Sequence, residues 1–279
     1  MTLNAPTQPG QSWEFVAPHG DRLRVVPERG GLVTSWVCQG VWGERELLYF
    51  DAERFADPAK SVRGGIPVLF PICGGLPGSA LPQHGFARNL PWQIQELPDH
   101  SGIGLSLSDS ADTLALFPHR FQLELELRPE RQALAINVRV SHPAAAGEPP
   151  LPFCFGLHPY FAVSDLRAAR LTGLPAVALD QAAGVSSPTA GLLAQLPSGV
   201  DLLAGPTPSA RLVVGDLAIS LDTQAPLDLA VVWTDPPRPM VCLEPWTAPR
   251  GALNSGERLL EVQPGSTVEL GCRYRVEAL

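Results

Sequence analysis

Between Gln122 and Val140 the chain reads QLELELRPERQALAINVRV. Leucines alternate with polar residues up to Leu127, and apolar residues alternate again from Ala133 onward. Successive side chains of a β-strand point to opposite faces, so this alternation is typical of two strands with one buried and one solvent-exposed face. The intervening RPERQ has the composition of a turn. We therefore predict a β-hairpin here.

Further strands are predicted on both sides of this hairpin. Toward the C-terminus, RLVVGDLAISLDT indicates a second hairpin with Gly215 and Asp216 at its turn, and LDLAVVWT, MVCLEPW and TVELGCRYRV indicate three more strands. Earlier strands are expected at RLRVVP, LVTSWVCQG and ELLYF. Only Ala111–Leu116 suggests a helix, and it is short. Many short strands with little helix favour an all-β sandwich or barrel.

Length and composition are consistent with one large domain. The chain has 279 residues, of which 45% are hydrophobic and only 17% charged, which excludes general disorder. Its 30 prolines and 26 glycines would interrupt helices too often for a protein built of long helices. We interpret Pro143–Pro152 and Gly184–Pro208, which are rich in Pro, Gly and Ala, as long loops, because strands that need partners lie on both sides. We expect residues 1–279 to form a single domain.

Charge and cysteine content exclude several classes of partner. A formal net charge of −8 argues against binding to nucleic acid or to an anionic membrane surface. The five cysteines contain no C-x-x-C pair, so we expect reduced, mostly buried thiols rather than a disulfide framework or a thiolate zinc site. The N-terminal MTLNAPTQPG does not have the pattern of a signal peptide, and no apolar run approaches the length of a membrane span. We expect a soluble cytoplasmic protein.

The first group of candidate site residues lies in the apolar segment Val62–Trp92. The patterns of P-loops, dinucleotide-binding loops, nucleophile elbows and zincins are absent from the sequence. Within the segment, Arg63, His84 and Arg88 stand among residues suited to close backbone packing. Polar groups in such surroundings are either paired or functional. Taken singly, Arg63 and Arg88 could equally cap carbonyls or pair with carboxylates, and His84 could equally be a hydrogen-bonded loop histidine, as belong to a site.

The second group consists of His158 in FCFGLHPYF and Glu244 in MVCLEPWTAPRG. Strand alternation places Glu244 on the same face as Trp246, where desolvation would raise the carboxyl pKa toward the range of a general base. Both residues could also have a purely structural role. His158 could be a hydrogen-bonded histidine of the core, and Glu244 could form an ion pair with Arg250 or Arg238.

Three blocks of sequence together resemble the aldose 1-epimerase (galactose mutarotase-like) superfamily, and most of all its hexose-6-phosphate mutarotase (glucose-6-phosphate 1-epimerase) branch. They are RGGIPVLFP with LPQHGFARNLPW between Arg63 and Trp92, GLHPYF around His158, and VCLEPWT around Glu244. Their order and wide separation also fit, so the resemblance spans most of the chain.

This resemblance implies a large antiparallel β-sandwich, the galactose mutarotase-like supersandwich, with a sugar cleft on one face. It implies interconversion of the α and β anomers of a hexose or hexose 6-phosphate, with Glu244 as general base and His158 as general acid and without a cofactor or metal. Arg63, His84 and Arg88 would bind the sugar or sugar phosphate, and we expect a monomer. For this chemistry, the two catalytic groups must lie within one sugar ring of each other.

One loop departs from the pattern of the superfamily. Relatives commonly carry an Asp-Arg pair there, with the aspartate on sugar hydroxyls, whereas this chain reads SGVDLLAG. Asp201 matches the aspartate, but Leu202 stands in place of the arginine, so the choice between a free hexose and its 6-phosphate is open. By residue type, Phe70, Trp246 and Phe161 are candidates for stacking on the sugar.

Two other functions are compatible with these residues. The first is a non-catalytic carbohydrate-binding or sugar-sensing protein on the same fold, although a pure binder has no need of an acid–base pair. The second is a two-histidine, one-carboxylate metal site formed by His84, His158 and Glu244 in a cupin-like barrel. Such barrels usually place two ligands close together on one strand, and this sequence does not.

Overall fold

The hairpin predicted around Gln122–Val140 forms part of a large sheet in the computed structural model, which describes residues 2–4, 12–143 and 145–279. Strands β9 (Gln122–Glu130) and β10 (Ala133–Ser141) pair antiparallel, and every second side chain of β9 is buried, as predicted. The turn is shorter than RPERQ suggests, because the strand continues through Pro129. The neighbouring β8 (Ile103–Ser108) pairs with β9 only as far as Leu127, which allows a proline beyond that point.

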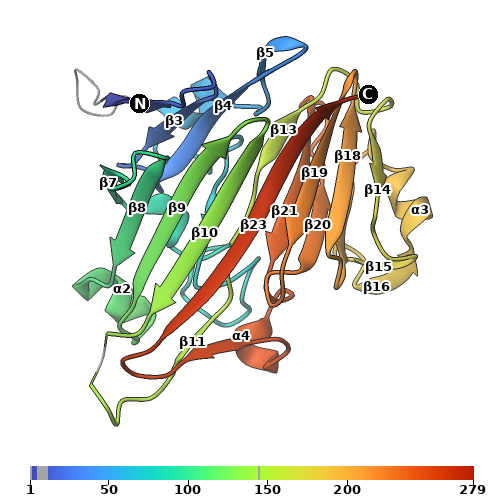
Figure 1. The fold of residues 1–279 in the computed structure, drawn as a ribbon. Coiled ribbons are helices and arrows are strands. Elements are labelled where there is room, and N and C mark those ends of the chain that lie inside the picture. Colours follow the sequence, from blue (N-terminus) through green and yellow to red (C-terminus); the bar gives the residue numbers. More distant parts are fainter. Residues whose placement is uncertain (1, 5–11, 144) are drawn as a thin grey trace.

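Eight antiparallel strands make up this sheet, and β8, β9, β10 and β23 run side by side across the front of Figure 1. The Gly215–Asp216 turn joins β18 to β19, which confirms the second predicted hairpin. In spatial order the strands are β14 (Arg170–Thr172), β18 (Ser209–Val214), β19 (Leu217–Thr223), β23 (Thr267–Ala278), β10, β9, β8 and β7 (Gln93–Glu96).

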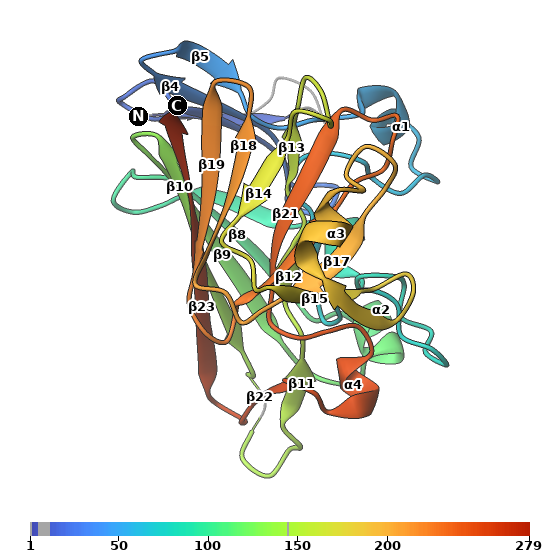
Figure 2. The ribbon, with the colours of Figure 1, turned by 90° about the vertical axis from the view of Figure 1, so that its right-hand side faces the viewer.

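A second sheet packs against the first to form the other layer of a sandwich, and the two layers separate clearly in Figure 2. Apolar side chains from both layers share one core, and Tyr274 of β23 donates a hydrogen bond across it to the Leu243 carbonyl (2.9 Å). The strands are, in order, β16 (Val185–Pro188), β15 (Val177–Asp180), β17 (Asp201–Ala204), β20 (Leu229–Trp233), β21 (Met240–Trp246), β12 (Gly156–Leu157) and β6 (Val68–Leu69), with β13 (Tyr160–Ala162) also on β21. The all-β antiparallel sandwich is confirmed.

Two smaller sheets complete the strand content of the described residues. One contains β1 (Thr2–Asn4), β2 (Trp13–Val16), β3 (Arg22–Val26), β4 (Leu32–Gly40) and β5 (Gly43–Glu46), and the other contains β11 (Leu151–Phe153) and β22 (Leu260–Val262). The prediction of a strand at ELLYF is wrong beyond Glu46, the last residue of β5. Leu48 and Phe50 make only isolated bridges, to Phe161 and Gly64, because this segment crosses from one sheet to another.

Over residues 2–4, 12–143 and 145–279, helices are few and short, as expected. They are α1 (Ala52–Ala56), α2 (Ala111–Leu116), α3 (Thr189–Leu193), α4 (Ala252–Ser255) and the 3₁₀ turn η1 (Ala87–Asn89). The predicted helix α2 begins after Ser110, whose hydroxyl accepts a hydrogen bond from the Thr113 amide and so caps the first turn. In the parts of the chain described here, no helix has the length and apolar character needed to cross a membrane.

The interpretation of Gly184–Pro208 as a long loop is wrong. This stretch contains β16, α3 and β17, and its buried Leu192, Leu196 and Leu202 join the main core. Its Gly, Ala and Pro content hides these widely spaced anchors. By contrast, the described residues of Pro143–Pro152 form a loop up to β11, apart from Ala144, which is outside the description.

All five cysteines are free and buried, as predicted. Most of the N-terminal decapeptide used in the signal-peptide argument lies outside the described residues.

The segment Val62–Trp92 is held by backbone contacts that require glycine, and Gly85 gives a test of them. Gly85 has φ +74° and bridges to Phe70, and a Cβ atom there would lie 2.0 Å from the Phe70 carbonyl oxygen. We expect Gly85→Ala to lower the free energy of unfolding by roughly 3 kcal/mol or more. Gly265 has the same φ of +74° but open space around it, so Gly265→Ala should cost only about 1 kcal/mol. Urea unfolding of both variants measures the difference, and equal losses would contradict the packing described.

Candidate active site

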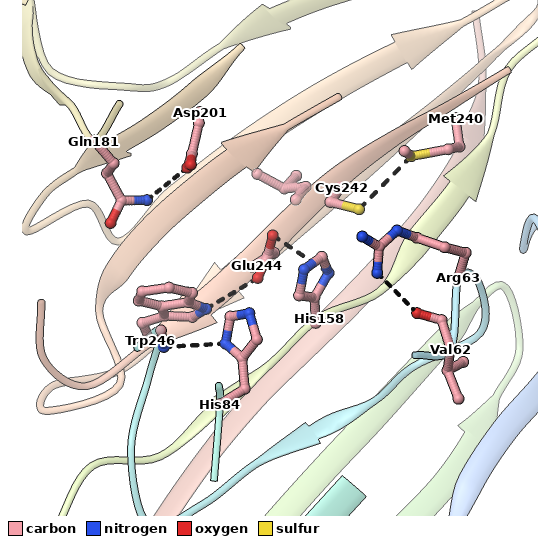
Figure 3. Close-up of polar contacts among 12 residues, drawn as sticks. Val62, Arg63, His84, His158, Gln181, Asp201, Met240, Cys242, Glu244 and Trp246 are labelled. Carbon is pink, nitrogen blue, oxygen red and sulfur yellow. Dashed lines mark hydrogen bonds and ion pairs between the residues drawn. The ribbon is translucent and has the colours of Figure 1, made fainter. Parts of the chain in front are cut away.

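One pocket collects all six site residues predicted from the sequence. It lies against the second sheet and encloses about 650 Å³ of space free of atoms, including its open mouth. Figure 3 shows polar contacts among residues in and around this pocket. The lining consists of Arg63, His84, Arg88, His158, Asp201 and Glu244, which were predicted, and Ser61, Gln83, Tyr160, Val231, Trp233, Trp246 and Arg250.

Glu244 lies near the C-terminal end of β21, which is buried along its whole length. Its side chain is 1% exposed, and Trp246 Nε1–H donates to Oε2 over 3.0 Å. Burial raises the pKa of the Glu244 carboxyl well above its usual range, and the Trp246 hydrogen bond offsets only part of that rise. Neither Arg250 nor Arg238 pairs with this carboxylate; their ion pairs are with other acids.

His158 lies between β12 and β13, and its ring faces Glu244 (Figure 3). Its Nδ1 is 3.4 Å from Glu244 Oε1, an alignment too poor for a hydrogen bond, and among the residues that the structure describes Nδ1 has no hydrogen-bond partner. The ring stacks on Tyr160, with centroids 4.7 Å apart and planes at 9°. Burial, with lesser contributions from nearby cationic groups, lowers the pKa of His158 well below its usual range.

His84 is held in a single orientation by a neighbouring loop. Its backbone has φ 66°, in the left-handed region, and its amide donates to the Gly74 carbonyl over 2.6 Å. The Gly74 amide in turn donates to His84 Nδ1 (3.0 Å). Burial lowers the pKa of His84 well below its usual range. Because Nδ1 accepts, the single ring proton lies on Nε2, which makes His84 a hydrogen-bond donor.

Arg63 and Arg88 bring positive charge to the pocket in different ways. The Arg63 guanidinium lies 5.5 Å from the Trp233 ring, 3.5 Å from Asp235 Oδ2, and within hydrogen-bond distance of Ser61 Oγ (3.2 Å). Arg88 sits on η1, half-buried, and within the described part of the chain it has neither an ion pair nor a partner for its Nε–H. Burial lowers the pKa of Arg88. The pocket therefore contains one cation without a counterion among the described residues.

Asp201, at the start of β17, is held by two donors that the sequence did not reveal. Gln181 Nε2 donates to Oδ1 (2.8 Å) and Arg250 Nη2 donates to Oδ2 (2.8 Å). Leu202, which follows Asp201, is fully buried in the core. The guanidinium beside this aspartate thus comes from the loop after β21.

The aromatic side chains at the pocket differ in part from the prediction. Trp246 lines it, but Phe70 and Phe161 belong to the sandwich core and do not. Tyr160 and Trp233 were missed. Trp233 pairs with Cys242 across β20 and β21, as Val231 pairs with Glu244, so it projects on the same face as the glutamate. The alternation in LAVVWT shows which residues share a face with Trp233. It does not show that this face lines the pocket until the neighbouring strand is known.

The alternative metal site would need His84, His158 and Glu244 to come together. In the described parts of the chain, one group of three potential ligand side chains lies with all ligand atoms within 4.8 Å, and it consists of His158, Cys242 and Glu244 without His84. Burial raises the pKa of the Cys242 thiol, so this third group is neutral. What the pocket assembles is a carboxyl and an imidazole, with pKa values shifted toward each other from opposite sides, beside donors and acceptors suited to a polyhydroxylated ligand.

Comparison with known proteins gives concordant results. The sequence profile described as aldose 1-epimerase matches residues 17–275. Two relatives are named "Putative glucose-6-phosphate 1-epimerase". The one from Cenchrus ciliaris is 35% identical over 155 residues, which is 52% of this chain. The one from Escherichia coli K12 is 34% identical over 160 residues, which is 54% of this chain. These matches span only about half the length of those relatives, 45% and 52%.

Solved structures match along the whole fold. The Slr1438 protein from Synechocystis sp. PCC 6803 has a TM-score of 0.89 at 35% identity, covering 100% of this chain and 98% of that one. A galactose mutarotase related enzyme from Lactobacillus acidophilus has a TM-score of 0.77 at 17% identity, covering 96% and 97%.

Proposed function

The chain belongs to the aldose 1-epimerase family, and on that premise we propose that it is a mutarotase that interconverts the α and β anomers of a hexose or a hexose 6-phosphate. The observation that carries this proposal is the 3.4 Å approach of Glu244 Oε1 to His158 Nδ1 at the floor of a pocket. A carboxyl and an imidazole so close can serve the two oxygens of one hemiacetal.

The proposed reaction needs only proton transfers. The Glu244 carboxylate takes the proton of the anomeric hydroxyl while the bond from C1 to the ring oxygen breaks, and the ring oxygen receives that electron pair together with a proton from the His158 imidazolium. The resulting aldehyde turns about its C1–C2 bond. Reclosure on the other face returns the proton of the ring-forming hydroxyl to His158, while the Glu244 carboxyl gives its proton to the aldehyde oxygen, which becomes the new anomeric hydroxyl. A base and an acid acting together avoid full charge on either oxygen.

Burial suits this pair to share one proton. It disfavours a charge on either side chain, which is why the pKa of Glu244 is raised and that of His158 lowered. The charged pair, which is the reactive form, and the neutral pair differ only by the position of that proton. His84, with its donor nitrogen fixed by Gly74, is placed to hold a sugar oxygen.

Arg88 supports an anionic group on the substrate. Arg88 is half-buried and has no ion pair among the described residues, so a bound anion would stabilise its charge. A phosphate fits the forked donors of a guanidinium. Arg63 lies on the same pocket and is already engaged by Asp235 and Ser61. We therefore propose a hexose 6-phosphate as the better substrate.

Replacing Arg88 tests this choice of substrate. Arg88→Met keeps much of the side-chain length, and we expect it to raise KM for glucose 6-phosphate by about tenfold to a hundredfold, because a charge-assisted contact is lost. The change for free glucose should stay under about threefold, since no phosphate is involved. Arg131→Met, at an exposed hairpin turn, is the control. Equal effects on both sugars would contradict a phosphate contact at Arg88.

Polarimetry tests the activity itself. Freshly dissolved α-glucose or its 6-phosphate should approach anomeric equilibrium faster with the protein than without it. Binding of a sugar without such acceleration would favour the carbohydrate-binding alternative instead.

We also propose that residues 1–279 act as one domain and as a monomer. Support for one domain comes from the main hydrophobic core, which is shared by the two layers of the sandwich and by strands of the N-terminal sheet.

A further inference from the structure

The Asp201 carboxylate is fixed from two sides. Gln181, just after β15, donates to one oxygen and Arg250 donates to the other, each over 2.8 Å. The Gln181 amide nitrogen of the backbone also donates to the Asp201 carbonyl (2.8 Å), so side chain and main chain are tied at the same point. An ionised carboxylate offers about four acceptor positions, and these two donors occupy two of them. The others are available to a ligand in the pocket.

Arg250 is itself fixed by the loop that holds His84. Gly74 has φ +79°, and a Cβ atom there would lie 2.4 Å from Arg250 Cγ and 2.8 Å from Cδ. The stem of Arg250 therefore packs directly over a glycine backbone. The amide of the same glycine donates to His84 Nδ1. Arg250 thus lies between two polar groups of the pocket, Asp201 and His84, and its position depends on both segments.

We propose that Arg250 is a positioning residue that determines sugar specificity, by holding the Asp201 carboxylate as a fixed acceptor for one hydroxyl of the sugar. This proposal rests on the proposed function. It assigns Arg250 no proton transfer. Instead, the guanidinium holds the carboxylate in one rotamer and balances its charge, so that a hydroxyl in the correct place meets an oriented acceptor.

The nature of the interaction predicts how variants should behave. Arg250→Gln leaves Asp201 with the Gln181 contact alone, so its carboxylate can turn and its charge is unbalanced. Binding of the sugar then weakens while the acid–base pair stays in place, and KM should rise by about tenfold with kcat within about threefold. Arg250→Lys keeps the charge without the planar fork and should give a smaller rise.

A panel of deoxyglucoses provides the decisive measurement. Mutarotation of glucose and of its 2-, 3-, 4- and 6-deoxy analogues is followed by polarimetry for the wild type, Arg250→Gln and Asp201→Asn. In the wild type, one analogue should lose about tenfold or more in kcat/KM, because its missing hydroxyl leaves Asp201 without a partner. In both variants that penalty should shrink to less than about threefold for the same analogue, while the penalties of the other analogues remain.

Several controls separate the possible outcomes. Arg275→Gln breaks a comparable Arg–Asp pair on the exposed sheet and should leave the panel unchanged. Gln181→Met removes the other donor and gives a second route to the same result if Arg250→Gln folds poorly. A uniform loss on every analogue overturns the proposal. If the wild type binds sugar without catalysing, binding of the same analogues is measured by the fluorescence of Trp233 and Trp246. Failure of the proposed function can then be distinguished from failure of this proposal.

Discussion

Glu244→Gln should abolish most of the mutarotase activity, lowering kcat by about a thousandfold. Glutamine has nearly the same shape as glutamate and can still accept the Trp246 hydrogen bond, so the strand and pocket should stay intact. What it lacks is a basic oxygen for the anomeric proton. Burial raises the pKa of the Glu244 carboxyl, which makes this oxygen a better base near neutral pH than an exposed carboxylate.

Polarimetry at saturating sugar measures this effect. The rate of spontaneous mutarotation is recorded without protein and subtracted from the observed rate. Glu261→Gln, on the exposed face of β22, is the matched control and should be fully active. Unchanged sugar binding by Glu244→Gln would show that the defect lies in the chemical step. If this variant retains more than about a tenth of the wild-type kcat, Glu244 is not the general base.

His158→Asn should have the second largest effect, a loss of about a hundredfold to a thousandfold in kcat. Asparagine can donate a hydrogen bond to the ring oxygen but cannot transfer a proton, so the leaving oxygen would have to depart as an alkoxide or take its proton from water. The exposed His100 supplies the control, His100→Asn, which should leave kcat unchanged. Activity of the His158 variant close to wild type would leave the imidazole with only a packing role.

The pH dependence of the wild type provides a second measurement of the same pair. On acidification, the pair takes up a second proton and loses its base; because the pKa of His158 is lowered, this limb should lie well below pH 6.5. On alkalinisation, the pair loses its last proton and with it the acid; because the pKa of Glu244 is raised, this limb should lie well above pH 4.5. kcat/KM should therefore be level across the interval between the two limbs. A maximum with steep decline on both sides of pH 6.5 would contradict the burial of the pair.

Much of the fold follows from local pattern, and the reasons for the failures are physical. The alternation in β9 and β10 and the turn at Gly215 are properties of a few consecutive residues, so the sequence is sufficient for them. The buried segments of the misassigned loop are anchored by widely spaced residues such as Leu192 and Leu196. Their burial depends on distant partners, which local composition does not report.

The candidate site shows the same division. Glu244 and His158 stand out because a polar residue in an apolar segment is unusual wherever it occurs. Trp233, Gln181 and Arg250 do not stand out, because each acquires its place from a neighbour far away in the chain: Trp233 from the register of β20 on β21, and the other two from Asp201. No pattern within a short window contains that information.

The contact between Tyr274 and the Leu243 carbonyl bears on how sugar scope could be altered. It anchors the strand carrying Glu244 to the opposite layer, whereas Gln181 and Arg250 sit on connections outside the strands. Under the proposed function, the general base thus lies on an anchored strand, whereas the two side chains that hold Asp201 lie on connections. A designer could rebuild those connections to admit a different monosaccharide and leave the reactive machinery as it stands.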